Sequence, residues 1–463
     1  MPRLFVPTLS RPRLRRGRLS LLALAVLAAG AIGLSGTARA QSLLVLYDAA
    51  RGYDAAYQSA RAQAESVVFR AEQSRALKRP SVNGTASWAE SRSETPYSST
   101  TVSRISQQTV TVTAQQSLFN RGHDKTIAQA DKAIEVARSQ LAAIEQDLIV
   151  RLAQAYFDVL AASDALGTVQ ASKKAITEQL ASAKRNFEVG TATITDTREA
   201  QAKFDLATAQ ELAAENDLNV KRLALEGVVG RTGVNPRPMA VPIVLPGTGA
   251  ADVEQWVTQA DQLSPPLTQL RLARDVARLE TEKARTGKLP TVGVSGSLSD
   301  AQTRLSGRTP AGSFGPSSGN GLSANVAVQL TLPLYTGESV QNRIKETLAL
   351  EDKAQSDLDA ARRSVAQGTR SAFFGLNSLR AQVKALEAAE SSSKLALEAT
   401  QLGYKVGVRV NLDVLNAQTQ LFQAQRDLAK ARYDVVVNSL KLRQVTGQLQ
   451  PQDVNTVDAL LAR

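Results

Sequence analysis

Residues 404–418 read YKVGVRVNLDVLNAQ, and residues 187–201 read FEVGTATITDTREAQ. Both stretches hold a Val-Gly pair, an aspartate six residues after the glycine, and an Ala-Gln pair at matching places. The similarity continues on both sides, so that residues 127–230 match residues 344–447 without a gap. Similarity at a fixed offset of 217 residues indicates a duplicated structural unit. The two halves are therefore expected to fold alike.

Long helices are predicted on both sides of each stretch, because proline is absent from residues 97–235 and 334–450. Apolar residues of the first copy recur at spacings of three and four: Leu141, Ile144, Leu148, Leu152, Ala155 and Val159. The second copy keeps a strict 3-4 alternation: Leu421, Ala424, Leu428, Ala431, Val435, Asn438, Leu442 and Val445. These periods predict helical hairpins over 124–230 and 340–447, too long and thin to enclose a globular core.

Four segments before the hairpins alternate with period two, which indicates strands. The segments are residues 81–89, 109–115, 291–299 and 325–332. One face of each is apolar and the other is polar, as the wall of a water-filled barrel in lipid requires. The connections 90–108 and 300–321 are rich in Ser, Thr, Gly and Pro and are expected to be exposed loops.

The rest of the chain fits around these parts. We predict one helix over 43–78, another over 267–288, an irregular connection over 231–266 that contains six prolines, and a tail over 451–463. The first structural repeat then spans 41–230 and the second spans 267–450. The fold class is mainly α with a small β part.

The first 40 residues resemble a secretory signal peptide. An arginine-rich start, the uncharged run Leu19–Leu34 and the site Ala38-Arg39-Ala40 predict a mature chain that starts at Gln41. The pair Arg15-Arg16 leaves a twin-arginine route open beside the general secretory route. Loss of the seven arginines of this segment lowers the formal net charge from +12 to +5. The remaining charges are interspersed, which argues against a nucleic-acid partner.

Composition excludes several kinds of chemistry. The chain has no cysteine, so disulfides, thiolate metal sites and thiol nucleophiles are impossible. Its single histidine, His123, cannot form a histidine-rich metal site and is expected at the surface near an element boundary. We expect no enzyme activity, no cofactor and no metal site.

A barrel is the expected membrane structure, since no apolar run after residue 40 reaches the ~20 residues of a membrane helix. Four strands cannot close a barrel, and the open edges must pair with other copies of the chain. A trimer gives twelve strands and room for a pore, whereas about eight strands leave a filled interior. The sequence favours a homotrimer and leaves a tetramer open.

The duplicated plan resembles the TolC family of outer-membrane efflux and type I secretion channels. Its most specific stretches are 403–417 and 187–196, supported by the strand-to-helix junctions at 116–119 and 332–335. The resemblance implies an outer-membrane barrel continuous with a periplasmic coiled-coil tunnel, closed at its tip. It also implies docking of a periplasmic adaptor and an inner-membrane transporter of the ABC, RND or MFS type, with no cofactor.

The same resemblance assigns roles at the tip. Tyr404 and Arg409 correspond to a periplasmic gate, bonded to Thr195 and Asp196 of the same and neighbouring helices; the alternative is an ordinary turn with a solvated arginine. Asp413 and Asn416 share a helix face and correspond to pore rings, although the family pattern has aspartate at both places. For Asp413 the alternative is a helix N-terminal residue favoured by the helix dipole.

Adaptor docking is implied for two short segments that correspond to grooves in the family. They are Val189, Gly190 and Thr191 in the first copy, and Val406, Gly407 and Val408 in the second. The alternative is a plain helix end, where glycine is common.

Two other classes of protein would explain part of the pattern. A periplasmic adaptor also has a long helical hairpin, but it would have one hairpin and no duplicated strand pair. A secreted filament protein would account for the helices and not for the amphipathic strands. The sequence does not distinguish drugs, metals or secreted proteins as cargo.

Overall fold

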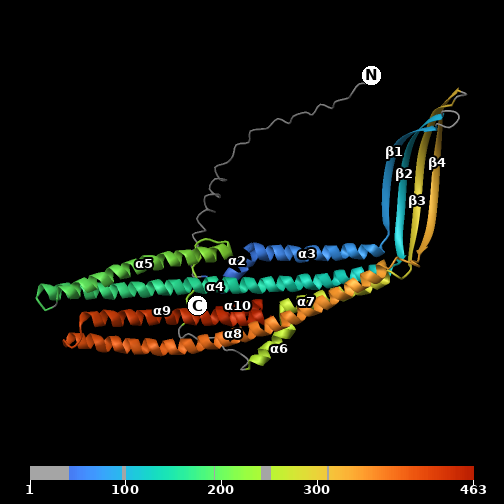
Figure 1. The fold of residues 1–463 in the computed structure, drawn as a ribbon. Helices are drawn as coiled ribbons and strands as arrows, with labels where there is room; N and C mark the ends of the chain where they lie inside the picture. The colour runs from blue at the N-terminus through green and yellow to red at the C-terminus, as the bar shows by residue number, and fades with distance from the viewer. Residues whose placement is uncertain (1–40, 96–100, 192, 241–251, 310–311, 463) are drawn as a thin grey trace, which may run out of the picture.

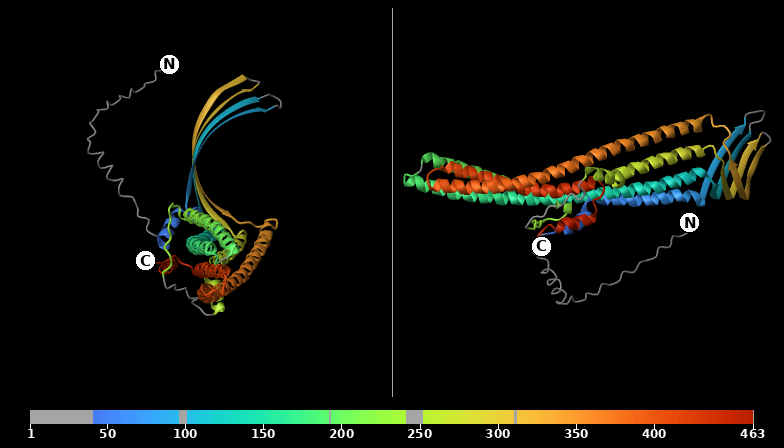
Figure 2. Two further views of the ribbon diagram at one scale, coloured as in Figure 1. Left: turned by 90° about the vertical axis from the view of Figure 1, so that its left-hand side faces the viewer. Right: turned by 90° about the horizontal axis from the view of Figure 1, so that it is seen from below.

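The computed structural model describes residues 41–95, 101–191, 193–240, 252–309 and 312–462. These residues form a long helical rod with a curled antiparallel sheet across one end (Figures 1 and 2). The expected signal peptide, residues 1–40, lies outside the described residues, as does part of the expected irregular connection. Within the described residues, no helix is long and apolar enough to cross a membrane.

The sheet has the strand order β1-β2-β3-β4, and every neighbouring pair is antiparallel. Its strands are β1 (Ser81–Thr95), β2 (Thr101–Phe119), β3 (Thr291–Thr309) and β4 (Gly312–Thr331). The prediction of loops over 90–108 and 300–321 was wrong for most of both ranges, which form strands. Their composition suggested loops, but each backbone finds a hydrogen-bonded neighbour, and the ladders therefore continue through polar residues.

The predicted alternation of faces is confirmed by the register of the strands. Val112 lies opposite Gly84 on one side and Leu298 on the other, and Leu298 lies opposite Ala324. The apolar positions of four strands thus share one face, and its large side chains are open, with Val326 80% exposed. An exposed apolar sheet face of this extent needs an apolar surrounding.

Each copy contributes one helical hairpin. The first consists of α4 (Arg121–Glu188) and α5 (Ile194–Val229), and the second of α8 (Ser339–Lys405) and α9 (Asn411–Val445). The 68 residues of α4 span about 100 Å at 1.5 Å per residue. The predicted seams are buried: Leu148, Leu152 and Val435 are each at most 1% exposed.

The single helix expected over 43–78 is in fact interrupted. Helix α2 (Leu43–Tyr53) ends at Asp54, whose side chain accepts the N–H of Tyr57 and caps α3 (Ala55–Arg75). A short 3-10 turn, Ala76–Lys78, follows. Gly52 is a poor helix former and Asp54 a common cap residue, so the break had local signals, which the prediction of one continuous helix overlooked.

The connection expected to be irregular over 231–266 contains helix α6 (Val253–Leu263) and the start of α7 (Pro265–Thr286). Pro265 and Pro266 begin α7 rather than break a helix, since the first helical turn needs no N–H partner. The expected tail holds one further helix, α10 (Pro451–Asp458). A proline count alone therefore overestimated the irregular part.

The main core lies at mid-height of the rod, where α2, α4, α5, α9 and α10 meet. Tyr156 is fully buried there, and its hydroxyl accepts the N–H of Arg237 at 2.7 Å. Tyr433 stacks on Phe157 and donates to Asp164 at 2.6 Å. Burial raises the pKa of both tyrosine hydroxyls, so they stay protonated and keep these hydrogen bonds.

Ion pairs hold the helices together near the sheet. Lys125 of α4 contacts Glu282 of α7 at 2.6 Å, and Arg343 of α8 contacts Glu280 of α7 at 2.7 Å. A hydrogen bond from Gln129, together with Arg343, lowers the pKa of Glu280. Helix α7 thus joins the two hairpins at the base of the sheet.

Candidate functional site at the helical tip

The two hairpin turns lie together at the end of the rod far from the sheet (Figures 1 and 2). The two turns have the same backbone conformation: Gly190 and Gly407 have φ angles of 77° and 79°. In the first turn the N–H of Thr191 donates to the carbonyl of Asn186 at 2.8 Å, and the equivalent bond of the second measures 2.9 Å. This is the Schellman helix end, in which glycine avoids the strain of a left-handed conformation.

The first turn satisfies its own polar groups. Thr193 caps α5, and its hydroxyl accepts the N–H of Asp196 at 3.2 Å and donates to the carboxylate at 2.8 Å. The same carboxylate accepts the N–H of Thr193 at 3.0 Å, which completes a capping box. Asp196 is therefore occupied within its own turn, and Thr195 beside it is exposed.

The second turn has no such cap. Val410 occupies the cap position of α9 and has no side-chain oxygen to offer. Asp413, which matches Asp196, pairs instead with Arg409 at 3.6 Å. A Cβ on Gly403 would lie 2.8 Å from the Cγ of Arg409, so the glycine makes room for the arginine stem.

Polar contacts join the two hairpins at this end. Asn186 of α4 donates to the hydroxyl of Tyr404 in α8 at 3.3 Å. Gln179 of α4 donates to Asn411 of α9, which is only 2% exposed. Lys203 of α5 donates to Asn416 of α9 at 3.3 Å.

An apolar cluster lies directly behind these contacts. It consists of Ile176, Leu180, Ala183, Ala200, Ala207 and Leu415. Leu415 of α9 is fully buried among side chains of the first hairpin. The tip is therefore a small interface between the two copies.

Of the predicted gate residues, Tyr404 bonds across this interface, whereas Asp196 and Arg409 bond within their own turns, so the bonds within one chain differ from the expectation. Among the described residues, neither Tyr404 nor Arg409 bonds to Thr195 or Asp196 of the same chain. Bonds to those residues in a neighbouring chain stay a prediction. Of the two predicted ring residues, Asp413 faces Arg409 and Asn416 faces Lys203.

The predicted docking segments are exposed. Val189, Val406 and Val408 are 72%, 66% and 78% exposed. No atom lies within 4 Å of a Cβ placed on Gly190 or Gly407, so the backbone there is open to approach.

Sequence reasoning missed the residues that join the hairpins, Gln179, Asn186, Lys203 and Asn411. A signal for one of them lies in the repeat itself. Asn186 aligns with Gly403, and Phe187 aligns with Tyr404, so one copy supplies the amide and the other supplies the hydroxyl. Here the mismatch between the copies lies at a contact between the two halves.

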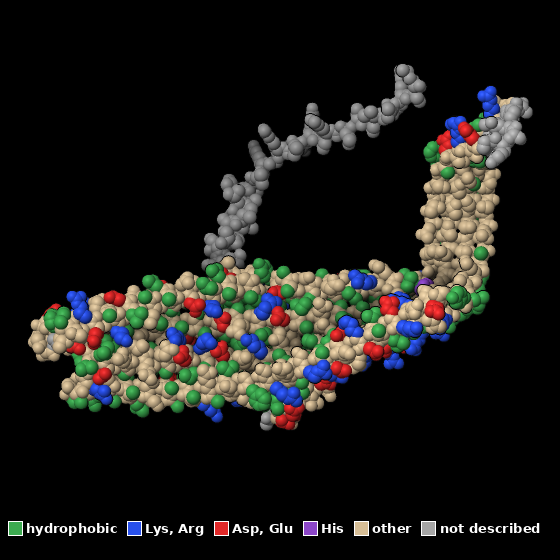
Figure 3. Space-filling model, viewed as in Figure 1, with side chains coloured by type: hydrophobic (Ala, Val, Ile, Leu, Met, Phe, Trp, Pro, Cys, Tyr) green, Lys and Arg blue, Asp and Glu red, His purple; other side chains and the backbone are tan. Residues whose placement is uncertain are grey.

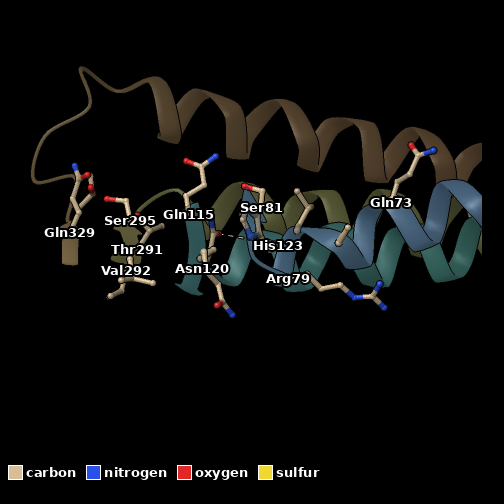
Figure 4. A pocket seen from close by; sticks show the side chains of 17 residues that line it. Gln73, Arg79, Ser81, Gln115, Asn120, His123, Thr291, Val292, Ser295 and Gln329 are labelled. Atoms are coloured by element: carbon tan, nitrogen blue, oxygen red, sulfur yellow. Dashed lines mark hydrogen bonds between the residues drawn. The ribbon is translucent and has the colours of Figure 1, made fainter. Parts of the chain in front are cut away.

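Away from the tip, a hollow lies at the base of the sheet (Figure 4). It is lined mostly by uncharged side chains such as Ser81, Gln115, Ser295 and Gln329, and also by Arg79 and His123. His123 stands at the third position of α4, near the element boundary as expected, and its Nδ1 is enclosed without a hydrogen-bond partner in the described residues. Within those residues no three His, Cys, Asp or Glu side chains form a group that could hold a metal.

The fold is shared with solved outer-membrane channels. The outer membrane protein VceC from Vibrio cholerae superposes with a TM-score of 0.70 at 19% identity, covering 88% of this chain and 96% of that protein. Together with the half-polar, half-apolar sheet, this likeness defines the fold class: a curled antiparallel sheet continuous with long helical hairpins, as in solved outer-membrane channels.

The chain belongs to the outer membrane efflux protein family, whose model matches residues 46–231 and 256–448. The two matched stretches coincide with the two copies of the repeat. The chain is 33% identical to the outer membrane protein TolC of Vibrio cholerae serotype O1, over 92% of this chain and 95% of that protein. It is 32% identical to the alkaline protease secretion protein AprF of Pseudomonas aeruginosa, over 75% of this chain and 71% of that protein.

Proposed function

We propose that three copies of this chain form the exit duct of an efflux pump or a type I secretion system. In this duct, twelve strands close a barrel in the outer membrane, and twelve long helices continue it through the periplasm. An inner-membrane transporter of the ABC, RND or MFS type supplies the energy, and a periplasmic adaptor docks at the exposed valines of the turns. The duct itself conducts passively.

The observation that carries this proposal is the sheet. Its apolar face is exposed, and β1 and β4 each pair with one neighbour only within the described chain. Unpaired strand edges cannot remain bare in lipid, where no water satisfies their N–H and C=O groups. Pairing of β4 with β1 of the next copy removes both edges, and three copies supply the strand number of a small open channel.

The tip is the proposed gate. At the tip the second hairpin contacts the first through single hydrogen bonds of Tyr404, Asn411 and Asn416; Asn411 is buried, and the bond of Asn416 is exposed. Such bonds contribute little individually, and partner docking therefore shifts the balance between closed and open tips with modest energy. A periplasmic adaptor is not supported as the identity of this chain, which belongs to the channel family.

The test is the mass and location of the mature protein. We expect a complex of three chains that fractionates with the outer membrane and stays intact in mild detergent. Reconstituted into planar bilayers, it should give small, stable conductance steps. A monomer that remains in the soluble fraction would overturn the proposal, and a complex of four chains would change the strand number to sixteen.

A further inference from the structure

Charged side chains are segregated across the sheet. Every charged residue of the four strands occupies an even-numbered position: Glu90, Arg92, Glu94, Arg104, Asp300, Arg304 and Arg308. The odd-numbered positions of 81–93, 103–117, 291–305 and 317–331 hold only Ser, Thr, Asn, Gln, Gly, Ala, Ile and Leu. One face of the sheet is thus free of charge over its described length.

The register keeps these two sets on opposite faces. Thr111 lies opposite Thr85 and Ser299, and its hydroxyl is 2.9 Å from that of Ser299. One residue along the chain, Asp300 lies opposite Val110 and Leu322 on the apolar face. Ser299 and Asp300 are therefore neighbours in sequence that point to opposite sides.

The uncharged face is the inner one if the sheet encloses a duct. Lipid requires the apolar face outside, which leaves the hydroxyl and amide face inside. The hollow at the base of the sheet opens on this same face, lined by Ser81, Ser295 and Gln329, with Arg79, two residues before β1 starts at Ser81, as the one arginine among its described lining residues (Figure 4). In Figure 3 the sheet face turned to the viewer shows almost no hydrophobic or charged side chains below the rim, where charged ones gather.

We infer that the exit segment of the duct carries no fixed charge and does not sort its cargo by charge. Rings of one sign of charge inside a channel attract one class of ion and repel the other. A wall of hydroxyl and amide groups holds water and neither traps nor repels groups of either sign. Such a wall admits cargo of either sign. Any ionic preference then arises in the helical part. The inference rests on the proposed duct.

The absence of cysteine makes a direct test possible. The Thr111→Cys protein, assembled in outer membranes, is treated with a cationic and an anionic methanethiosulfonate of similar size. We expect both to react, with a rate ratio within about twofold of the ratio for a free thiol in solution, because no fixed charge lies nearby. A ratio skewed by tenfold would overturn the neutral wall and leave the duct intact.

Two further variants make the result specific. Adding Ser299→Asp to Thr111→Cys should favour the cationic reagent by at least about fivefold, since the carboxylate faces the thiol directly, whereas Ser299→Asn should leave the ratio unchanged. If Ser299→Asp does not assemble, Thr85→Asp places the charge on the other side of Thr111. The duct itself is tested by Val110→Cys on the opposite face. Reaction at Val110→Cys and none at Thr111→Cys would mean that the faces are reversed, and the proposed duct would fail.

Discussion

The two hairpin turns have the same backbone conformation, but their polar side chains form different hydrogen bonds. In the first, Thr193 and Asp196 form hydrogen bonds with each other, three residues apart. In the second, Val410 offers no cap, and Tyr404 and Asn411 reach to the first hairpin instead. The polar side chains of the first turn bond within that turn, whereas Tyr404 and Asn411 of the second hairpin bond to the first hairpin.

This difference separates bonds made within one turn from bonds made between the hairpins. Substitution of Thr193 acts within the first turn, whereas substitution of Tyr404 or Asn411 removes a contact between the hairpins. Under the proposed gate, only the second kind of substitution acts on closure. Substitutions at the two turns should then have effects of different kinds.

The largest effect is expected from the double substitution Tyr404→Phe with Arg409→Ser. It removes the hydroxyl that Asn186 contacts and the fork of donors beside Asp413. The Tyr404 bond joins neutral groups and the Arg409–Asp413 pair is largely exposed, so each contributes about 1 kcal/mol or less, repeated in three copies. Conductance in planar bilayers should rise several-fold while the trimer survives, since the helix seams are untouched. A trimer that conducts like the parent would show that these residues do not hold the gate.

A smaller rise in conductance is expected from Asn186→Ala, which removes the partner of Tyr404 and leaves Arg409 in place. If the bond between them acts as a unit, adding Tyr404→Phe to Asn186→Ala should change little further. Additive effects of the two substitutions would mean that the hydroxyl acts through another contact. Lys184→Ala, on the same helix and outside these contacts, serves as the control.

The first turn should respond in stability rather than conductance. Thr193→Ala removes the capping box and should cost about 1 kcal/mol of local helix stability, seen as faster amide hydrogen exchange over 194–198. Conductance should stay at the parent value. A large conductance change would show that the first turn also takes part in closure.

The reciprocal substitution sharpens the same comparison. Val410→Thr places a hydroxyl at the cap of α9, three residues before Asp413, and recreates the arrangement of Thr193 and Asp196. Amide exchange at the start of α9 should slow, and Asp413 should be drawn away from Arg409. Unchanged exchange would mean that the second turn cannot form the box.

The smallest effect is expected from Asp413→Asn, which removes one carboxylate per chain. Because Arg409 lies 3.6 Å away and already offsets that charge, the preference for cations should fall only slightly. Reversal potentials in a salt gradient measure this preference. A complete loss of cation preference would show that Asp413 lines the pore free of its arginine.

Sequence reasoning succeeded where a pattern repeats and failed where one residue decides. The 217-residue offset and the spacings of three and four placed both hairpins, because long seams average over many side chains. The break at Asp54 and the start of α6 at Asp252 each depend on a single cap and were missed. The strands were underestimated, since composition does not reveal that a polar segment has a hydrogen-bonded neighbour.

At the tip, the sequence located the residues and not their partners. Periodicity shows that Asp413 and Asn416 share a helix face, but not that Arg409 and Lys203 lie beside them. Those contacts depend on how the second hairpin packs on the first, at separations of more than 200 residues for Lys203 and Asn416. A pattern within one helix carries no such information.

The matched lengths of the helices constrain how this protein can change over evolution. Helices α4 and α8 have 68 and 67 residues, and α5 and α9 have 36 and 35. Insertion of one heptad into both helices of a single hairpin would displace its turn by about 10 Å from the other and separate Asn186 from Tyr404. Insertions and deletions in the rod should therefore survive only as matched sets, equal in length in all four helices.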